Sequence, residues 1–359
     1  MNKGVYERLR VFLDRLPSGF PSTPDGIEIR LLKKLFSPSE AELTCRLSDD
    51  PETVAVISSR IGMEPSILAD RLESMAKKGL IFRVRRNGEP LYQAYQFMIG
   101  IYEFQVMALD REFCELFEAY LPYVALSIST VKTSQMRILP VESAVETAAE
   151  VGTYDRIREL VSKQELVCVA PCICKKEHEI LGTPCDKPVE VCLGFADFAR
   201  FYLDNGFARE IDHEEAFQIL DQAEAAGLVL MPTNSKEISA VCCCCTCCCA
   251  SLKYVKMASN PARWVHAPYY AAVDADLCTF CEDCMERCPM DALEAADDVM
   301  TVIKKRCIGC GLCVSACPTE ALKMIPKPDM PIPPDRYSDT IKQISAERGL
   351  DDPAKKGIR

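Results

Sequence analysis

The sequence predicts an α+β protein of several domains, and three observations support this expectation. First, its 359 residues suffice for two or three domains of ordinary size, and 48% of them are hydrophobic. Second, the N-terminal part has a series of helix signals that ends in an Asn-Gly hairpin signal. Third, the last third of the chain repeats one cysteine pattern. A second cysteine-rich region lies between these parts, and we expect it to be mostly helical.

Start and stop signals define the N-terminal elements in order. Apolar periodicity and capping residues predict helices over 4–17, over 27–36, after the capping box Ser37-Pro38-Ser39-Glu40, from Asp50-Pro51-Glu52 to about Arg60, and from Pro65 to Lys78. Gly79 closes the last of these helices. The alternating segment from Phe82 leads into Asn87-Gly88, which predicts a two-stranded hairpin.

This order of elements resembles the winged-helix domains of bacterial regulators over residues 25–97. The resemblance implies DNA contact through the helix at 65–78, with three wing arginines on phosphates, Arg83, Arg85 and Arg86. The alternative is a docking or dimerisation module. The segment holds 11 basic and 11 acidic residues, and the presumed recognition helix carries three acids, Glu64, Asp70 and Glu73. DNA is therefore the less favoured partner.

Two cysteine runs near the C-terminus have the spacing CxxCxxCxxxCP, one from Cys278 to Pro289 and one from Cys307 to Pro318. This spacing is the ligand pattern of two [4Fe–4S] clusters, in which the fourth cysteine of each run binds the other cluster. One predicted ligand set is therefore Cys278, Cys281, Cys284 and Cys317. The other predicted set is Cys307, Cys310, Cys313 and Cys288. A pair of zinc knuckles is the alternative, although zinc sites more often use two CxxC pairs or mixed Cys and His.

Residues 270–326 resemble bacterial 2[4Fe–4S] ferredoxins, because each run is followed by a short helical turn and a small strand. The resemblance implies clusters that are fully ligated by protein and that transfer single electrons. Gly309 and Gly311 match the family's close approach of backbone to cluster, whereas the first loop has Phe280 and Glu282 at the comparable places. From 273 to 325 the module holds 10 acidic and 5 basic residues, which suits a basic redox partner.

Twelve cysteines lie between Cys168 and Cys249, where a ferredoxin has no counterpart. In a loop, Cys242-x2-Cys245-x2-Cys248 repeats the spacing of three cluster ligands; in a helix, Cys242, Cys245 and Cys249 share a face. A separate four-thiolate set is Cys172, Cys174, Cys185 and Cys192. We therefore expect one or two additional Fe–S clusters, with structural zinc or an unmetallated loop as alternatives. Cys45 and Cys114 lie in predicted helices, where we expect them to act as small buried apolar residues.

Composition narrows the functional classes. The net charge of −11 argues against broad nucleic-acid binding. The sequence contains no run of 18 consecutive apolar residues, so we do not expect a membrane-spanning helix. Twenty-two cysteines without a signal peptide favour a reducing cytoplasm, as in an anaerobe. The dinucleotide pattern GxGxxG and the P-loop pattern are absent from the sequence.

The leading functional hypothesis is an electron-transfer iron–sulfur protein, a ferredoxin-like subunit or partner of an anaerobic multi-subunit oxidoreductase. One alternative is a redox- or metal-responsive winged-helix regulator. Another is an oxidoreductase with a substrate-binding cluster in 168–249. The expected domains are an N-terminal helix (1–24), a winged-helix-like domain (25–97), a helical linker region (98–165), a Cys-rich metal or Fe–S domain (166–250), the 2[4Fe–4S] module (270–326) and an extended or flexible tail (327–359).

Overall fold

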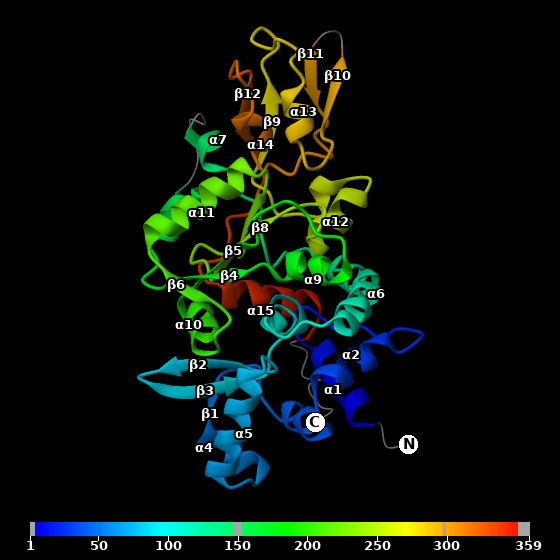
Figure 1. Ribbon diagram of the computed structural model, residues 1–359, viewed down its shortest axis with the longest axis vertical. Helices are drawn as coiled ribbons and strands as arrows, with labels where there is room; N and C mark the ends of the chain where they lie inside the picture. The colour runs from blue at the N-terminus through cyan, green and yellow to red at the C-terminus, as the bar shows by residue number, and fades with distance from the viewer. Residues whose placement is uncertain (1–3, 147–152, 297–298, 351–359) are drawn as a thin grey trace.

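The computed structural model describes residues 4–146, 153–296 and 299–350. Figure 1 shows an elongated molecule with three tiers. The N-terminal helices and a small sheet form one end, a larger sheet lies in the centre, and two strand pairs form the opposite end. The cysteines that the sequence singles out lie in the central tier and at this opposite end.

The N-terminal tier contains the helices and the hairpin that the capping signals predict. Its elements are α1 (Val5–Asp14), α2 (Ile27–Leu35), α3 (Pro38–Thr44), β1 (Glu52–Thr53), α4 (Val54–Ile61), α5 (Pro65–Lys77), β2 (Phe82–Arg86) and β3 (Glu89–Gln93). The capping box is confirmed, because Ser37 and Glu40 each bond the other's backbone. Helix α4 begins slightly later than predicted, since Thr53 is its cap and residues 52–53 pair with β3. The sheet order is β1-β3-β2.

The segment after the hairpin is built around one long helix. Its elements are η1 (Phe97–Ile101), η2 (Glu103–Gln105), α6 (Arg111–Ile128), α7 (Glu142–Glu146), η3 (Thr153–Asp155) and α8 (Ile157–Ser162). Helix α6 packs against α2 and against the first helix of the central tier. Cys114 on α6 is fully buried, as its apolar role predicts, whereas Cys45 is half-buried.

The central tier corrects the expectation of a mostly helical middle region. It is a five-stranded antiparallel sheet in the order β6-β4-β5-β8-β7, flanked by helices. The elements are β4 (Val167–Pro171), α9 (Ile173–Leu181), β5 (Glu190–Phe195), α10 (Ala196–Asp204), β6 (Arg209–Ile211), α11 (His213–Ala225), β7 (Val229–Pro232), β8 (Ala240–Cys244) and α12 (Ala250–Met257). The strands are three to six residues long, which is too short for a clear twofold pattern. The helical reading of residues 242–249 is wrong, because residues 242–244 belong to β8.

The C-terminal tier consists of two antiparallel strand pairs, β9 with β12 and β10 with β11. Its elements are η4 (Pro261–Arg263), β9 (Tyr269–Val273), α13 (Asp283–Arg287), β10 (Leu293–Ala296), β11 (Val299–Val302), α14 (Leu312–Ser315) and β12 (Leu322–Pro326). Helices α13 and α14 each lie within one of the two cysteine runs, where they carry Cys284 and Cys313, and they contact each other. The helical turn expected after each run is instead a short turn followed by a strand. The repeat therefore brings its two cysteine runs together.

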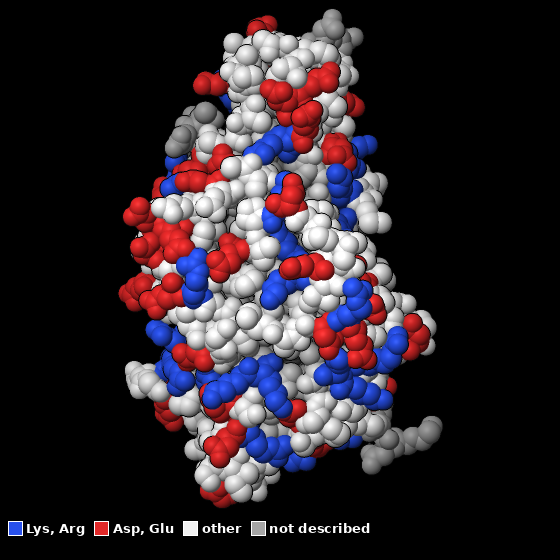
Figure 2. All heavy atoms as spheres, in the orientation of Figure 1, with Lys and Arg blue, Asp and Glu red and all other residues white. Residues whose placement is uncertain are grey.

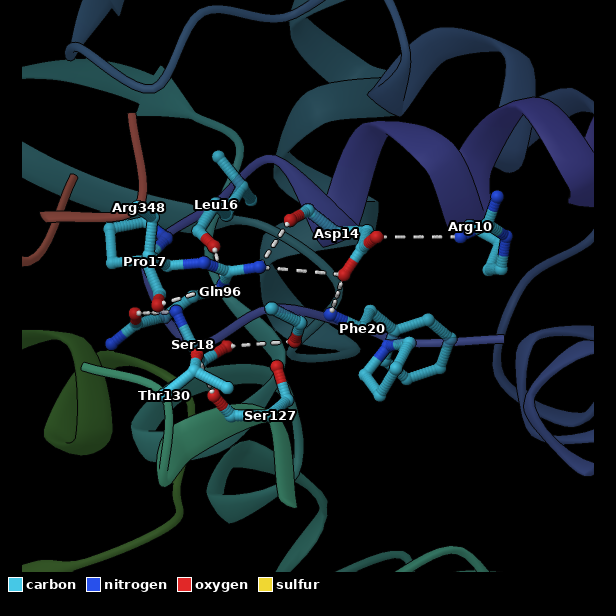
Figure 3. A network of polar contacts seen from close by, with 12 residues as sticks. Arg10, Asp14, Leu16, Pro17, Ser18, Phe20, Gln96, Ser127, Thr130 and Arg348 are labelled. Carbon is cyan, nitrogen blue, oxygen red and sulfur yellow. Dashed lines mark hydrogen bonds and ion pairs between the residues drawn. The ribbon is translucent and has the colours of Figure 1, made fainter. Parts of the chain in front are cut away.

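The segment expected to be an extended or flexible tail contains a helix, α15 (Tyr337–Glu347). One face of this helix is buried and includes the side chains of Ile344 and Thr340. Just after the helix, the Arg348 guanidinium donates to the carbonyl oxygens of Leu16 (3.0 Å), Pro17 (3.1 Å) and Asp14 (3.1 Å), as Figure 3 shows. The chain thus returns from the far end of the molecule to its first helix. Residues 351–359 of the expected tail lie outside the described residues.

Two apolar cores hold these tiers together. One core runs through the N-terminal tier, α6 and α10, with Phe20, Phe97 and Phe201 fully buried. The other is continuous from the central sheet into the C-terminal tier and contains cysteines from both. The central and C-terminal tiers therefore share one interior. Within the part of the chain that the structure describes, no helix combines the length and the apolar character needed to cross a bilayer.

Candidate metal centres

Two small cavities in the C-terminal tier are each lined by four thiols. One cavity is lined by Cys278, Cys281, Cys284 and Cys317, which we call the exposed tetrad. The other is lined by Cys288, Cys307, Cys310 and Cys313, which we call the buried tetrad. Each tetrad takes three cysteines from one run and the last cysteine from the other, so the packed repeat builds both cavities jointly.

The two tetrads differ in their access to solvent. In the buried tetrad, Cys307, Cys310 and Cys313 are each no more than 8% exposed. In the exposed tetrad, Cys281 is open to solvent. The loop of the buried tetrad is also covered from outside, because the Val141 amide donates to the Cys310 carbonyl at 3.0 Å. One thiol set therefore faces the end of the molecule and the other faces its interior.

The backbone of the two cysteine loops explains where glycine is required. Gly309 and Gly311 have φ of +69° and +77°, and the corresponding Phe280 and Glu282 have φ of 56° and 65°. A Cβ on Gly309 would lie 2.2 Å from the Tyr269 carbonyl oxygen, which leaves no room for a side chain. In the solvent-exposed loop a side chain meets no such wall and carries only the cost of the left-handed conformation.

Amide donors approach several of these sulfurs. The Ala271 amide donates to Cys307 Sγ at 3.4 Å, and the Ala292 amide donates to Cys288 Sγ at 3.2 Å. Burial nevertheless raises the pKa of Cys288, and it raises the pKa of Cys284 to about 11. Neutral thiols of this kind become thiolates when a cation binds between them, which is how metal binding and deprotonation are linked.

Cys317, in the exposed tetrad, differs from Cys284 in the direction of its pKa shift. Burial opposes its ionisation, but the amides of Thr319 and Leu322 and the Thr319 hydroxyl outweigh it, and the pKa of Cys317 falls below its ordinary value.

These thiol cavities, the amide-to-sulfur hydrogen bonds and the repeat agree with one family. Residues 271–324 match the family model of the 4Fe-4S dicluster domain. We call this range the dicluster module, and its match supports iron–sulfur cluster binding.

The match covers the C-terminal tier and leaves the central tier without a counterpart. No curated protein and no solved structure matches the chain. The chemistry of the central cysteines is therefore argued from their geometry alone.

Six central thiols form a connected group, which we call the inner thiol set. Its members come from the start of α9, from β5, from β8 and from the start of α12, namely Cys172, Cys174, Cys192, Cys242, Cys244 and Cys249. Cys192 and Cys242 are direct partners across β5 and β8. Pairwise side-chain interactions link Cys192 to Cys242, Cys242 to Cys244, Cys244 to Cys249, Cys249 to Cys174, and Cys174 to Cys172.

Negative charge is distributed unevenly over the inner thiol set. Interaction with Cys192 lowers the pKa of Cys242, and interaction with Cys174 lowers the pKa of Cys249. The partner thiols raise the pKa of Cys192 and Cys174, so thiols that ionise readily alternate with thiols that stay neutral. Lys175 lies 4% exposed beside the set, held by the Pro188 carbonyl at 2.7 Å, and its charge also favours the Cys242 thiolate. A buried cation next to several thiols stabilises thiolates that a metal would bind.

Four further thiols form a second, tighter group, the outer thiol set. Cys185, Cys245, Cys247 and Cys248 have sulfur atoms that all lie within 4.8 Å of one another. Cys185 lies in the loop between α9 and β5, and the other three lie in the turn between β8 and α12. Cys247 is exposed, whereas Cys245 and Cys248 are buried.

The structure divides the predicted central residues between these sets. Cys172, Cys174, Cys192 and Cys242 lie in the inner thiol set, and Cys185, Cys245 and Cys248 lie in the outer thiol set. The predicted CxxCxxC reading of 242–248 therefore does not describe one group, because β8 directs Cys242 away from the turn. The predicted ligand residues omit Cys244 and Cys249 of the inner set and Cys247 of the outer set, although the helical reading groups Cys249 with Cys242. Alternation along a strand would have grouped Cys242 with Cys244.

The three arginines of the β2–β3 hairpin, which were expected to contact phosphates, are engaged within the chain. Arg83 is 2% exposed and contacts Asp204 of α10 at 3.3 Å. Arg85 donates to the same carboxylate at 2.7 Å, and Arg86 makes two bonds of 2.7 and 2.6 Å to Asp197. The hairpin is thus docked on the central tier, and the charges expected to contact phosphates are neutralised there.

Proposed function

We propose that this protein is an electron-transfer iron–sulfur protein that holds two [4Fe–4S] clusters in its dicluster module. The ligands would be Cys278, Cys281, Cys284 and Cys317 for one cluster, and Cys288, Cys307, Cys310 and Cys313 for the other. The observation that carries the proposal is the pair of four-thiol cavities within a matched dicluster family domain. Clusters of this kind, when bound, accept and release single electrons.

The arrangement of the residues supports a role between an external partner and the interior. The exposed tetrad is surrounded by the exposed acids Glu282, Asp283 and Glu286, and Figure 2 shows acidic side chains gathered at this end of the molecule. Such a surface favours a redox partner with a basic face, within a transient or multi-subunit complex. The buried tetrad lies behind it, in the core that is continuous with the central sheet.

We also propose that the inner thiol set holds an additional Fe–S cluster. Six thiols that are linked in a chain, rather than gathered around one point, suit a group with several metal ions. The buried Lys175 charge lowers the pKa of Cys172 and Cys242, which favours the thiolates that such a group requires. A protein with this many free thiols is suited to a reducing compartment, and we place it in the cytoplasm.

For residues 25–97 we propose a winged-helix module that serves as a docking platform rather than as a DNA reader. The order of helices and the hairpin support the winged-helix assignment. The ion pairs of the wing with α10 support docking. On α5, the exposed side chains include Glu64, Ile67 and Asp70, which do not suit a phosphate backbone.

Iron and acid-labile sulfide per chain, measured after anaerobic purification, test the proposal. The dicluster module alone gives about 8 irons, and a four-iron cluster on the inner set raises this to about 12. Cys310→Ser is expected to remove about four irons and Cys242→Ser to remove the additional ones, whereas Cys45→Ser, outside every set, leaves the content unchanged. Wild-type protein without labile sulfide would refute the proposal.

A further inference from the structure

We propose that the outer thiol set is a mononuclear zinc site, formed by Cys185, Cys245, Cys247 and Cys248 and separate from every iron–sulfur ligand set. The proposal does not depend on electron transfer by the dicluster module. It rests on the size of the set, on the chain geometry that produces it and on where it lies.

The spacing of the sulfurs fits one ion. Four thiolates around one tetrahedral ion at a Zn–S distance of about 2.3 Å have sulfurs about 3.8 Å apart. Here all four sulfurs lie within 4.8 Å of one another, and the Cys247 and Cys248 sulfurs are 3.9 Å apart. The four thiolates of a [4Fe–4S] cluster bind four different irons and are spread more widely. Among the described residues, neither tetrad of the dicluster module contains three ligand atoms gathered this tightly.

The chain supplies three of the ligands from one turn. The Cys249 amide donates to the Cys245 carbonyl at 3.1 Å, which closes the turn and brings three thiols of four consecutive residues to one point. Ligands so close in sequence suit a single ion, whereas the CxxCxxC loops of the dicluster module spread theirs over one cluster. An S4 donor set with this geometry is typical of zinc.

Cys185 reaches the same point from another loop. Two residues after Cys185, the Lys187 ammonium donates to the Ala226 carbonyl at the end of α11 at 2.7 Å, which holds that loop against the neighbouring helix. The Cys185 sulfur already lies within 4.8 Å of the other three, so it can bind the same ion without large movement of the loop.

The site would tie this loop to the turn that leads from β8 to α12. Cys244 and Cys249 of the inner thiol set flank that turn directly. Zinc does not change its oxidation state, so it would fix the turn while the inner set changes charge. The zinc would therefore be a structural element that holds the turn beside the inner thiol set.

Metal analysis of four proteins tests the assignment: the wild type, Cys247→Ser, Cys242→Ser and Cys45→Ser. Cys247 is exposed, so its substitution is expected to leave the fold intact. We expect one zinc per chain in the wild type and its loss in Cys247→Ser, with iron and sulfide retained. Cys242→Ser should show the reverse, and Cys45→Ser should match the wild type. Zinc-edge X-ray absorption should show four sulfurs at about 2.3 Å.

Other results would overturn the proposal. Loss of about four irons with their sulfide from Cys247→Ser would assign the outer set to a cluster. Loss of one iron without sulfide would assign it to mononuclear iron, and unchanged metal content would show that the four thiols bind none. If Cys247→Ser proves unstable, Cys185→Ser on the other loop gives the same readout. Absence of labile sulfide from the wild type would refute the iron–sulfur proposal and leave the zinc result unaffected.

Discussion

At the scale of single residues, the dicluster module shows how burial decides what a left-handed position tolerates. Gly309 and Phe280 have the same backbone conformation at equivalent places in the two loops. Gly309 faces the β9 backbone, and Phe280 belongs to the exposed loop. The requirement for glycine therefore comes from the neighbouring strand and not from the loop itself.

Gly309→Ala is expected to destabilise the protein by at least about 2 kcal/mol and to lower its iron content, because the new Cβ would collide with the Tyr269 carbonyl. Gly62→Ala is the matched control, since Gly62 has φ of +71° with nothing within 4 Å of a Cβ. That change should cost only about 1 kcal/mol and no iron. Urea unfolding and iron analysis of both variants measure the difference. Equal losses in the two variants would contradict the role of β9.

A buried carboxyl on α9 predicts a pH dependence of stability. Burial raises the pKa of Glu177 from 4.5 to about 7, its Oε2 accepts from Tyr102 at 2.5 Å, and its Oε1 has no hydrogen-bond partner in the described structure. Between these two pKa values, the Glu177 carboxyl keeps its proton in the folded state and releases it in the unfolded state. The contribution of Glu177 to the free energy of unfolding is therefore fully present below about pH 4.5 and is lost as the pH rises to about 7.

Glu177→Gln should remove this decline. The change that it causes in the free energy of unfolding should be about 2 kcal/mol more favourable at pH 8 than at pH 5. Glu179→Gln, on an exposed position of the same helix, should show no such difference. Urea unfolding at the two pH values measures it. A gain at pH 5 equal to that at pH 8 would show that charge is not the cause.

At the scale of elements, the docked hairpin joins the N-terminal tier to the central sheet. Arg83 lies between Glu73 of α5 at 2.7 Å and Asp204 of α10 at 3.3 Å, and its side chain is 1% exposed. The two carboxylates remain partly solvated, which reduces the cost of bringing the arginine between them. Arg83 is consequently the residue on which the hairpin's orientation depends most.

Arg83→Leu is expected to lower the free energy of unfolding by about 2–3 kcal/mol, because two carboxylates lose their buried partner. Arg86→Leu removes an exposed pair and should cost less than about 1 kcal/mol. Urea unfolding of the two variants checks the contrast. A larger effect of Arg86→Leu would mean that the buried ion pairs of Arg83 contribute less than the exposed pair.

Helices with caps could be predicted from the sequence, and the central sheet could not. Ser37, Glu40, Asn87 and Gly88 act within a few residues of chain, so their signals are local. The strand containing Cys242 and Cys244 exists because β5 and β7 flank it, which is information carried by distant residues. The thiol groupings of the dicluster module follow from its repeat, whereas the inner and outer sets depend on that unpredicted sheet.

At the scale of the whole molecule, charge and access are arranged along the long axis. The exposed tetrad and its acids lie at one end, and the docked N-terminal tier lies at the other. Encounter with a basic partner should therefore favour the end that holds the exposed tetrad, by an attraction that salt screens.

The triple variant Glu282→Gln, Asp283→Asn, Glu286→Gln should slow electron transfer from the reduced protein to a basic cytochrome c about tenfold at low ionic strength and lose most of the salt dependence. The control changes three acids of the N-terminal tier, Asp49→Asn, Asp50→Asn and Glu64→Gln. Stopped-flow traces at several salt concentrations give the slopes. Equal slopes for both variants would place the encounter elsewhere.

The contacts of Arg348 with residues 14–17 also have a consequence in time. The carbonyls of Asp14, Leu16 and Pro17 are synthesised more than 300 residues before the guanidinium that caps them. At about 5–20 residues per second, this interval lasts roughly 15–70 s. The dicluster module is synthesised within that interval. Because Arg348 follows it in the chain, both cysteine runs leave the ribosome and become available to metal before the Arg348 contacts can form.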